Sequence, residues 1–298
     1  MSSSHILSIV TFIYGLAFFL YLFEWVFKKE TAGRMATAVA ILGFTGNTAG
    51  IILRWVESYQ LGIGHAPLSN MYESLVFFSF SIGIIYLVLE RRYKTSVIGA
   101  VATPLAFLAM AYASLAPGIN DRIQPLIPAL KSNWLIAHVI TCFLGYAAFA
   151  VAFGVSIMYL IKTKERPSSS NGMALHIPQS ELLDELTHQL VMFGFLFLTV
   201  GIITGAVWAN EAWGTYWSWD PKEVGSWIIW LFYTGYLHAR YQRGWRGRKA
   251  AILSIVGGWV GIPHFMGGGA HFSEFLAPVF GGGHGAGHGA EVAHGAIS

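Results

Sequence analysis

Eight long apolar runs dominate this 298-residue sequence and restrict the folds open to it. A helix that crosses the hydrocarbon core of a bilayer needs about 20 predominantly apolar residues. Because backbone amides in lipid must bond within their own segment, such runs form helices. We therefore predict an all-α, polytopic integral membrane protein with about eight transmembrane helices. They are expected at roughly 5–27, 35–54, 73–90, 96–115, 134–161, 187–208, 224–240 and 250–265.

The composition is typical of a chain that lipid solvates. Hydrophobic residues make up 55% of the sequence and charged residues only 11%, against about 25% charged residues in an ordinary soluble domain. The single cysteine, Cys142, lies inside an apolar run, so we expect it to serve packing and to form no disulfide within the chain. We find no nucleotide-binding loop, zinc spacing or Ser–His–Asp pattern, and we expect no nucleic-acid partner.

The basic residues fall in alternate connections. Of 18 Lys and Arg residues, three follow the first apolar run, three the third, three the fifth and five the seventh. Connections rich in Lys and Arg stay in the cytoplasm or an equivalent compartment. Both termini are therefore predicted outside, in the periplasm or lumen. The other outside segments are about 55–72, 116–133 and 209–223.

We divide the chain into a transmembrane domain, residues 1–278, and a tail, residues 279–298. The tail is rich in Gly and His and includes His284, His288 and His294. Such low-complexity sequence cannot bury a core, so we predict a flexible tail rather than a metal site.

An aromatic segment, residues 209–223, lies between the sixth and seventh apolar runs. Trp213, Tyr216, Trp217 and Trp219 fall within seven residues, and Asp220 and Pro221 follow. Large flat side chains bury much area, so the segment suits a flat apolar ligand. The alternative is an interfacial belt of Trp and Tyr, which is common in membrane proteins that bind nothing there. For Asp220 we favour helix capping over a general-acid role.

Histidines on the outer side favour the ligand. His138 lies near the outer end of the fifth run, and His271 lies just beyond the eighth. Two imidazoles beside an aromatic platform suit the iron of a porphyrin. His264 competes with His271, and spacing does not choose between them. His65 is in an outer loop that we expect near this site.

The remaining histidines are predicted elsewhere. His238 lies at the inner end of the seventh run, about 30 Å of bilayer away from the outer site. It is either a surface residue whose polar tip reaches water or a ligand in a second, inner site. His176 and His188 are expected to be solvated on the inner side.

Two further motifs accompany the aromatic segment: Gly64–Ser74, ahead of the third run, and Tyr236–Arg240. With Trp213–Glu223, Trp227 and Trp230, they make the chain resemble the heme-handling membrane proteins of cytochrome c maturation that carry a WWD signature. It is most similar to the CcsA (ResC) family of the system II pathway. The resemblance covers residues 35–275.

This resemblance implies a membrane protein that brings heme to the outer side. There it works with a CcsB (ResB) partner to attach heme to the Cys-x-x-Cys-His motifs of apocytochrome c. The pair would act as a thioether-forming holocytochrome c synthase, in a bacterial cytoplasmic membrane or a thylakoid membrane. The WWD segment would face the periplasm or lumen.

The resemblance also implies the site residues. In the outer site, Trp213, Gly214, Trp217, Trp219 and Asp220 would lie against heme b. His138 and His271 would ligate its iron there, and we place His65 among the cofactor-binding residues. His238 would ligate heme at the inner site, with a companion ligand from the CcsB partner. Around His271 the sequence departs from the family's usual wording.

Two other functions compete with this one. One is a heme exporter or chaperone of the CcmC type, which forms no thioether bond; the Gly64–Ser74 and Tyr236–Arg240 motifs favour the CcsA type. The other is a b-type electron-transfer protein, which requires paired histidines near both membrane surfaces within one chain. Only one good inner histidine, His238, is present.

Overall fold

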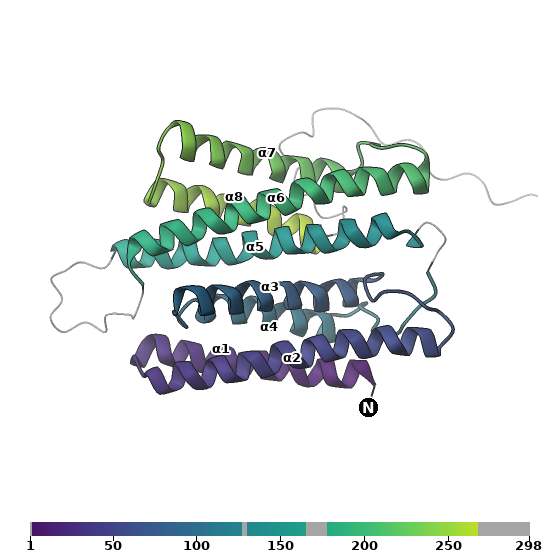
Figure 1. Cartoon of the computed structure of the whole chain (residues 1–298), viewed down its shortest axis with the longest axis horizontal. Coiled ribbons are helices and arrows are strands. Elements are labelled where there is room, and N and C mark those ends of the chain that lie inside the picture. Colours follow the sequence, from purple (N-terminus) through teal and green to yellow (C-terminus); the bar gives the residue numbers. More distant parts are fainter. Residues whose placement is uncertain (1, 127–129, 165–177, 268–298) are drawn as a thin grey trace, which may run out of the picture.

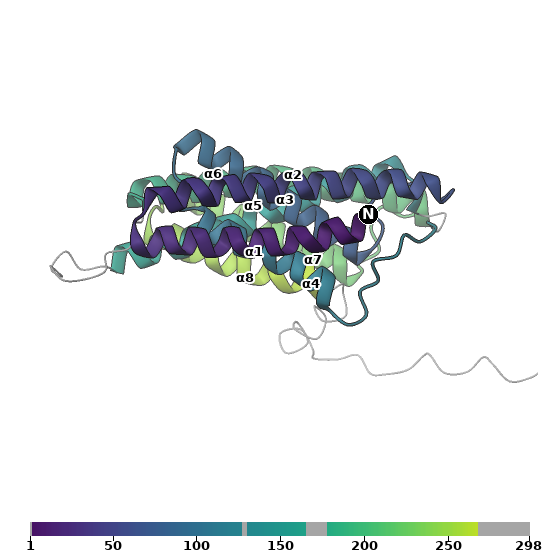
Figure 2. The same ribbon diagram turned by 90° about the horizontal axis from the view of Figure 1, so that it is seen from below.

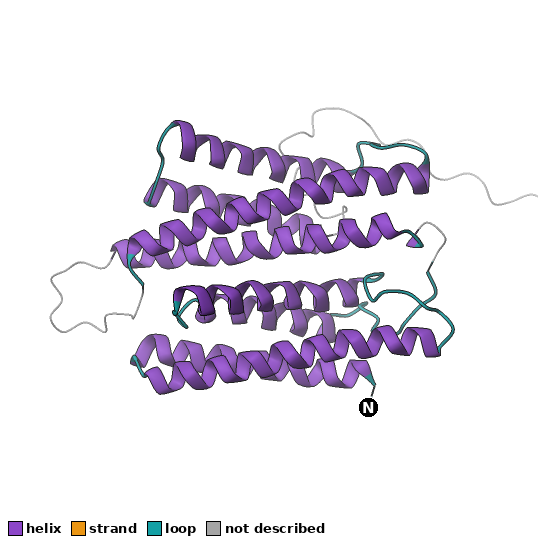
Figure 3. Ribbon diagram, viewed as in Figure 1, coloured by secondary structure: helices purple, strands orange, loops and turns teal. Residues whose placement is uncertain are grey.

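A computed structural model describes residues 2–126, 130–164 and 178–267 of the chain, with backbone only for 262–267. The described residues fold as helices joined by loops, without strands (Figures 1 and 3). The helices are α1 (Ser3–Phe27), α2 (Glu30–Gln60), α3 (Met71–Tyr93), α4 (Gly99–Leu115), α5 (Asn133–Lys164), α6 (Ser180–Trp213), α7 (Pro221–Gln242) and α8 (Arg248–Gly267).

Each of the eight predicted runs corresponds to one helix; seven lie entirely within it, and the fourth, 96–115, begins three residues before α4. The all-α class is confirmed for the described residues. Two helices are clearly longer than predicted. The second was expected over 35–54, and α2 spans 31 residues; the sixth was expected over 187–208, and α6 spans 34. At 1.5 Å per residue α2 is about 46 Å long, which exceeds the hydrocarbon thickness. Both helices therefore continue beyond their apolar stretch.

The helices form two rings of four. In the first ring, α1 and α3 each pack on α2 and α4; in the second, α5 and α7 each pack on α6 and α8. The rings meet where α5 contacts α3 and α4. Figure 1 shows the first ring below the second, with all helices close to the long axis of the molecule. Seen from below, α1 and α2 lie side by side (Figure 2).

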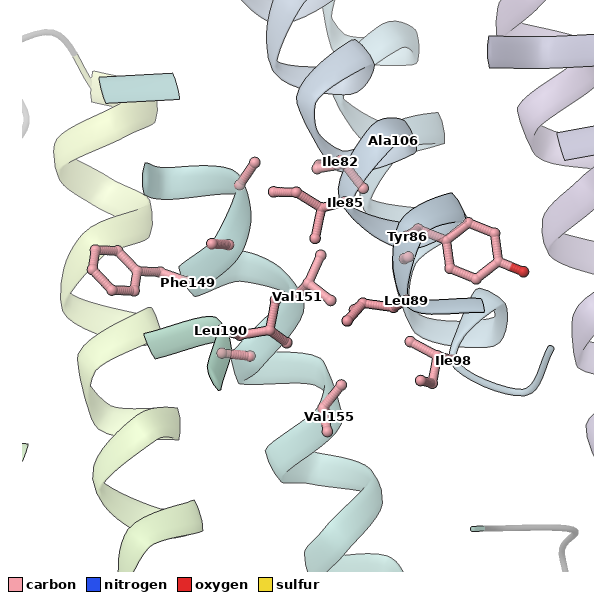
Figure 4. Close-up of a cluster of buried hydrophobic side chains, with 14 of the residues drawn as sticks. Ile82, Ile85, Tyr86, Leu89, Ile98, Ala106, Phe149, Val151, Val155 and Leu190 are labelled. Carbon is pink, nitrogen blue, oxygen red and sulfur yellow. The ribbon is translucent and has the colours of Figure 1, made fainter. Parts of the chain in front are cut away.

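Branched aliphatic side chains fill the junction between the rings. Ile82, Ile85 and Leu89 of α3 face Val151 and Val155 of α5, and all five are buried (Figure 4). Helices in lipid gain little hydrophobic free energy from associating, so close packing of this kind carries their stability.

Glycines bring α5 and α6 into backbone contact. A Cβ atom on Gly145 would lie 3.1 Å from the carbonyl oxygen of Gly194, and one on Gly194 would lie 3.0 Å from the carbonyl oxygen of Gly145. Small residues allow this close approach in membrane helices. The result is a tightly packed pair in which side chains on α5 have fixed positions relative to α6.

Five helices, namely α1, α2, α3, α5 and α6, are long and apolar enough to cross a membrane; α4 is apolar but has only 17 residues. The protein is an integral membrane protein by this measure and by its relatives, described below. The short connections after α1, α3 and α7 lie at the left end in Figure 1, opposite the aromatic segment between α6 and α7. The basic connections thus gather at one end of the bundle.

Candidate functional site

His138 lies on α5, one to two turns from the end that carries the aromatic segment. Its Nδ1 atom is 2.7 Å from the backbone carbonyl oxygen of Gly201 on α6. A carbonyl only accepts hydrogen bonds, so Nδ1 carries the proton. In the neutral ring the lone pair is then on Nε2, which is the arrangement of a histidine that ligates a metal.

Gly205, one turn along α6, makes room for the imidazole of His138. A Cβ atom there would lie 2.6 Å from His138 Nδ1 and 2.7 Å from Cε1, a separation that real Cβ contacts do not adopt. The ring of Trp208 lies nearly parallel to the His138 ring, at an interplanar angle of 11° with centroids 6.3 Å apart. The imidazole is therefore oriented by its hydrogen bond and by contacts from one helix.

Trp208 also connects His138 to the aromatic segment, because it meets Trp213 edge to face at 6.3 Å. Gly214 then ends α6 with a left-handed φ of +79°, which a residue with a side chain rarely adopts. The α6 helix thus includes Trp213, and the loop of the aromatic segment begins immediately after it.

The loop ends at a well-formed helix cap. The Asp220 carboxylate accepts the backbone N–H groups of Lys222 at 2.7 Å and Glu223 at 2.8 Å, and Pro221 occupies the first turn of α7. The Glu223 carboxylate in turn accepts the N–H of Ser218 at 2.7 Å. The predicted capping role of Asp220 is confirmed.

Most aromatic side chains near the end of α6 and in the loop before α7 are exposed rather than buried. Trp213 is 63% exposed, Tyr216 60% and Trp219 68%. Trp219 has a left-handed φ of +62°, which is unusual for a bulky residue and is found at ligand sites. It meets Trp217 edge to face at 5.8 Å and Trp227 at 6.3 Å.

Trp217 adds an unsatisfied donor to this surface. Its indole Nε1 is buried and has no hydrogen-bond partner within the described residues. An indole N–H only donates, so it suits an acceptor such as a carboxylate oxygen. Exposed ring faces, a free donor and an oriented imidazole fit a flat apolar ligand that has acidic edges and a metal, and heme has all three features.

His65 lies in the loop between α2 and α3, and only 7% of it is exposed. Its Nδ1 is 2.8 Å from the carbonyl oxygen of Ala66, and its Nε2 is 3.0 Å from that of Gln124. Its backbone is fastened to Ser58 on α2. Both ring nitrogens thus contact carbonyl groups, and the ring joins the loop after α2 to the loop after α4.

The Gly64–Ser74 motif also contributes Glu73 to a buried ion pair that the sequence did not reveal. Arg54 Nε is 2.8 Å from Glu73 Oε1, with side chains 2% and 0% exposed. Glu73 Oε2 accepts the N–H and hydroxyl of Ser69, both at 2.8 Å, and Asn70 caps α3 by accepting the N–H of Glu73. Arg54, near the end of α2, is thus a buried part of the first ring.

His238 lies on α7, and its side chain is exposed. Tyr236 and Arg240, two residues to either side, are buried. Residues seven and eleven positions apart share a helix face, so His238 lies on one face with Leu231 and Trp227, which are 43% and 42% exposed. The described residues of this chain leave that face uncovered.

His188 was predicted to be solvated, but it is 7% exposed. It packs on α7 between the rings of Tyr236, at 6.4 Å, and Tyr241, at 5.5 Å. Beside it, Asp184 bonds both Arg240 and the backbone N–H of Gly247. Sequence reasoning missed this cluster because a hydropathy pattern does not show which face of a helix end another helix covers.

The remaining predicted ligands have little or no description. His271 and the tail, residues 279–298, lie outside the described residues, as does His176. His264 falls near the end of α8, where only the backbone is described. Of the predicted outer residues, the structure therefore brings together His138 and the aromatic segment.

Known proteins resemble this chain over most of its length. A family model for the Cytochrome C assembly protein matches residues 68–260. Cytochrome c biogenesis protein CcsA of Synechococcus sp. (strain CC9605) is 41% identical over 249 residues, which cover 75% of this chain and 79% of that protein. The protein of the same name from Prochlorococcus marinus (strain MIT 9303) is 37% identical over 260 residues, covering 78% and 80%.

A solved structure shares the fold. Cytochrome c Heme Lyase CcmF superposes with a TM-score of 0.67 over 94% of this chain, at 18% sequence identity. The matched part is 50% of that protein, so this chain spans about half of its length.

Proposed function

The chain belongs to the cytochrome c assembly protein family, among proteins of the CcsA type, and from this we propose that it is the heme-handling half of a cytochrome c synthase. A role in cytochrome c biogenesis and heme handling comes with the family. The finer proposal is that the chain moves heme across the membrane and, with a CcsB (ResB) partner, attaches it to apocytochrome c. The observation that carries it is the His138 imidazole, whose proton is held on Nδ1 beside exposed tryptophans.

We place the outer heme site between His138 and the aromatic segment. His138 would hold the iron through Nε2, with His271 as the second ligand. Trp213, Trp217 and Trp219 would cover the ring, and the free indole N–H of Trp217 would meet a propionate. Gly214 and Asp220 act on this site by fixing the two ends of the loop.

Heme b supplies the vinyl groups to which the two cysteine thiols of an apocytochrome add. The contribution of this chain is to hold the ring still and to exclude water from its faces. His65, whose two ring nitrogens contact carbonyl groups, would support the outer loops around this site. A direct contact between His65 and heme would require one of those two contacts to break.

The inner site is proposed at His238. Its exposed position on an uncovered face of α7 is suited to a heme shared with a second chain. The companion ligand would then come from the CcsB partner. The basic connections at that end offer cations to the propionates. We propose that this end faces the cytoplasm or stroma, and that the aromatic segment faces the periplasm or lumen of a bacterial cytoplasmic or thylakoid membrane.

The experiment that tests the outer site is the absorption spectrum of the purified chain, oxidised and dithionite-reduced. We expect the wild-type chain, co-purified with CcsB, to show low-spin six-coordinate heme, and His138→Ala to lose or alter that signal. His238→Ala should lower heme loading at both sites, because heme would reach the outer site by way of the inner one. If the wild-type chain contains no heme in any preparation, the proposed site is wrong and the tryptophans form an interfacial belt instead.

Co-expression separates synthase from carrier. With CcsB and an apocytochrome c present, the proposed synthase yields covalent heme that resists acid–acetone extraction. A CcmC-type carrier yields heme-loaded chain but no covalent product. A b-type electron-transfer protein would bind heme at both ends without any partner chain. The exposed position of His238 favours the first outcome over the third.

A further inference from the structure

An apolar cavity of about 250 Å³ lies between the two rings of helices. Its wall is formed by side chains of α3 and α4 from the first ring and of α5, α7 and α8 from the second. The α8 side of the wall is made of Gly257, Gly258 and Gly261. At Gly261 an added Cβ atom would have no neighbour closer than 4.0 Å, so space remains beside it.

The residues that line the cavity determine which kind of ligand it can hold. Neither a histidine nor a charged side chain lines the described wall, and its only side-chain polar atoms are the hydroxyls of Tyr146 and Tyr233. Such a wall offers iron no imidazole or thiolate and offers a propionate no cation, so it does not suit heme. It suits a neutral, apolar molecule. An apolar cavity of about 150 Å³ already takes up benzene and stays free of water.

The surface around the cavity indicates where that molecule comes from. Leu108, which lines the cavity, is 60% exposed near the middle of α4, and Tyr112 and Leu115 are exposed on the same helix. The cavity is therefore continuous with an apolar outer surface. At the middle of a membrane helix, the molecules in contact with such a surface are the hydrocarbon tails of lipids.

We propose that this cavity is a lipid site, which takes one acyl chain of a bilayer phospholipid past Leu108. The chain fills a space that would otherwise leave its lining without packing contacts. It would also touch both rings at once, because helices of both rings line the cavity. This proposal is independent of the heme chemistry above.

Photocrosslinking tests the proposal on the wild-type chain in nanodiscs. The probe is phosphatidylcholine with a diazirine near the middle of one acyl chain, and labelled residues are found by peptide mass spectrometry. Phe149 and Tyr233 line the cavity and are 3% and 0% exposed, so lipid outside the protein does not reach them. We expect labels on these two residues. Labels confined to exposed positions such as Leu108 and Leu196 would overturn the proposal.

Two cavity-filling variants, Gly261→Leu and Ala109→Leu, should abolish the labels on Phe149 and Tyr233. The matched control is Leu196→Trp, a bulky change at a position 59% exposed on α6, which should leave them unchanged. Excess hemin should not compete with the probe. Labels that persist in both filled variants, or that hemin removes, would show that the space is not an acyl-chain site.

Discussion

Gly205 is the residue on which the geometry of His138 depends. A methyl group at this position would overlap the imidazole, because the added Cβ would lie 2.6 Å from Nδ1. Gly205→Ala should therefore move the His138 ring away from the Gly201 carbonyl, although His138 itself is unchanged. We expect heme retention at the outer site to fall about 10–100-fold, as it does when a metal ligand loses its orienting contacts. The measurement is heme titration followed by absorption.

The matched control is Gly235→Ala on α7, where an added Cβ meets no atom within 4 Å. This variant should keep the wild-type spectrum. Equal loss in both variants would indicate a general effect of helix substitution, and an unchanged Gly205→Ala spectrum would place the heme away from His138.

Single residues show the limit of what the sequence predicts. The cap at Asp220 was predictable because Asp-Pro before a helical run is a local signal. The buried Arg54–Glu73 pair was not, because its members lie 19 residues apart on different helices and nothing local links them. His188 was mistaken for a solvated residue for the same reason.

At the scale of elements, α7 is held by its cap at one end and by an ion pair at the other. Asp220→Ala removes the acceptor for two N–H groups, which should cost about 1 kcal/mol of stability. Asp220→Asn keeps an acceptor and should be nearly as stable as wild type. Thermal unfolding of the detergent-solubilised chain measures both.

The same pair of variants separates capping from a direct electrostatic role. If Asp220 serves the outer site only by fixing α7, Asp220→Asn should retain the heme spectrum. Loss of outer heme in Asp220→Asn at wild-type thermal stability would show instead that the negative charge acts on the ligand.

Apolar runs located all eight helices but not their ends. Glu57 and Asp184 fall outside the predicted apolar runs, yet both lie inside helices, where their side chains bond partners on other segments. The Glu57 carboxylate accepts a hydrogen bond from the backbone N–H of Ser3 on α1, and the Asp184 carboxylate accepts one from the Arg240 guanidinium on α7. A hydropathy pattern locates only the part of a helix that lies in the hydrocarbon core. The helix itself can continue into the polar region wherever its side chains bond to other segments.

For the whole molecule, the testable feature is its orientation in the membrane. Leu61→Cys, at the end of α2, and Arg243→Cys, after α7, introduce exposed thiols at opposite ends of the bundle. A membrane-impermeant maleimide applied to spheroplasts should label only Leu61→Cys. Arg243→Cys should react after permeabilisation.

The wild-type chain, whose single cysteine Cys142 lies within α5, gives the background in this experiment. The opposite pattern would reverse the orientation and place the aromatic segment in the cytoplasm. Equal labelling of both variants in intact cells would contradict a fixed transmembrane arrangement.

The partner of the His138 imidazole has a consequence for redox chemistry. A histidine that donates Nδ1–H to a carboxylate gains anionic character, which stabilises ferric iron; the Gly201 carbonyl is uncharged and has a weaker effect. Bound through Nε2, this ring would leave the reduction potential of the iron higher than a carboxylate-paired ring would. In the proposed outer site, a neutral backbone carbonyl on α6 would therefore stabilise ferric iron less than a carboxylate partner would, and the ferrous state that thioether formation requires would be easier to reach.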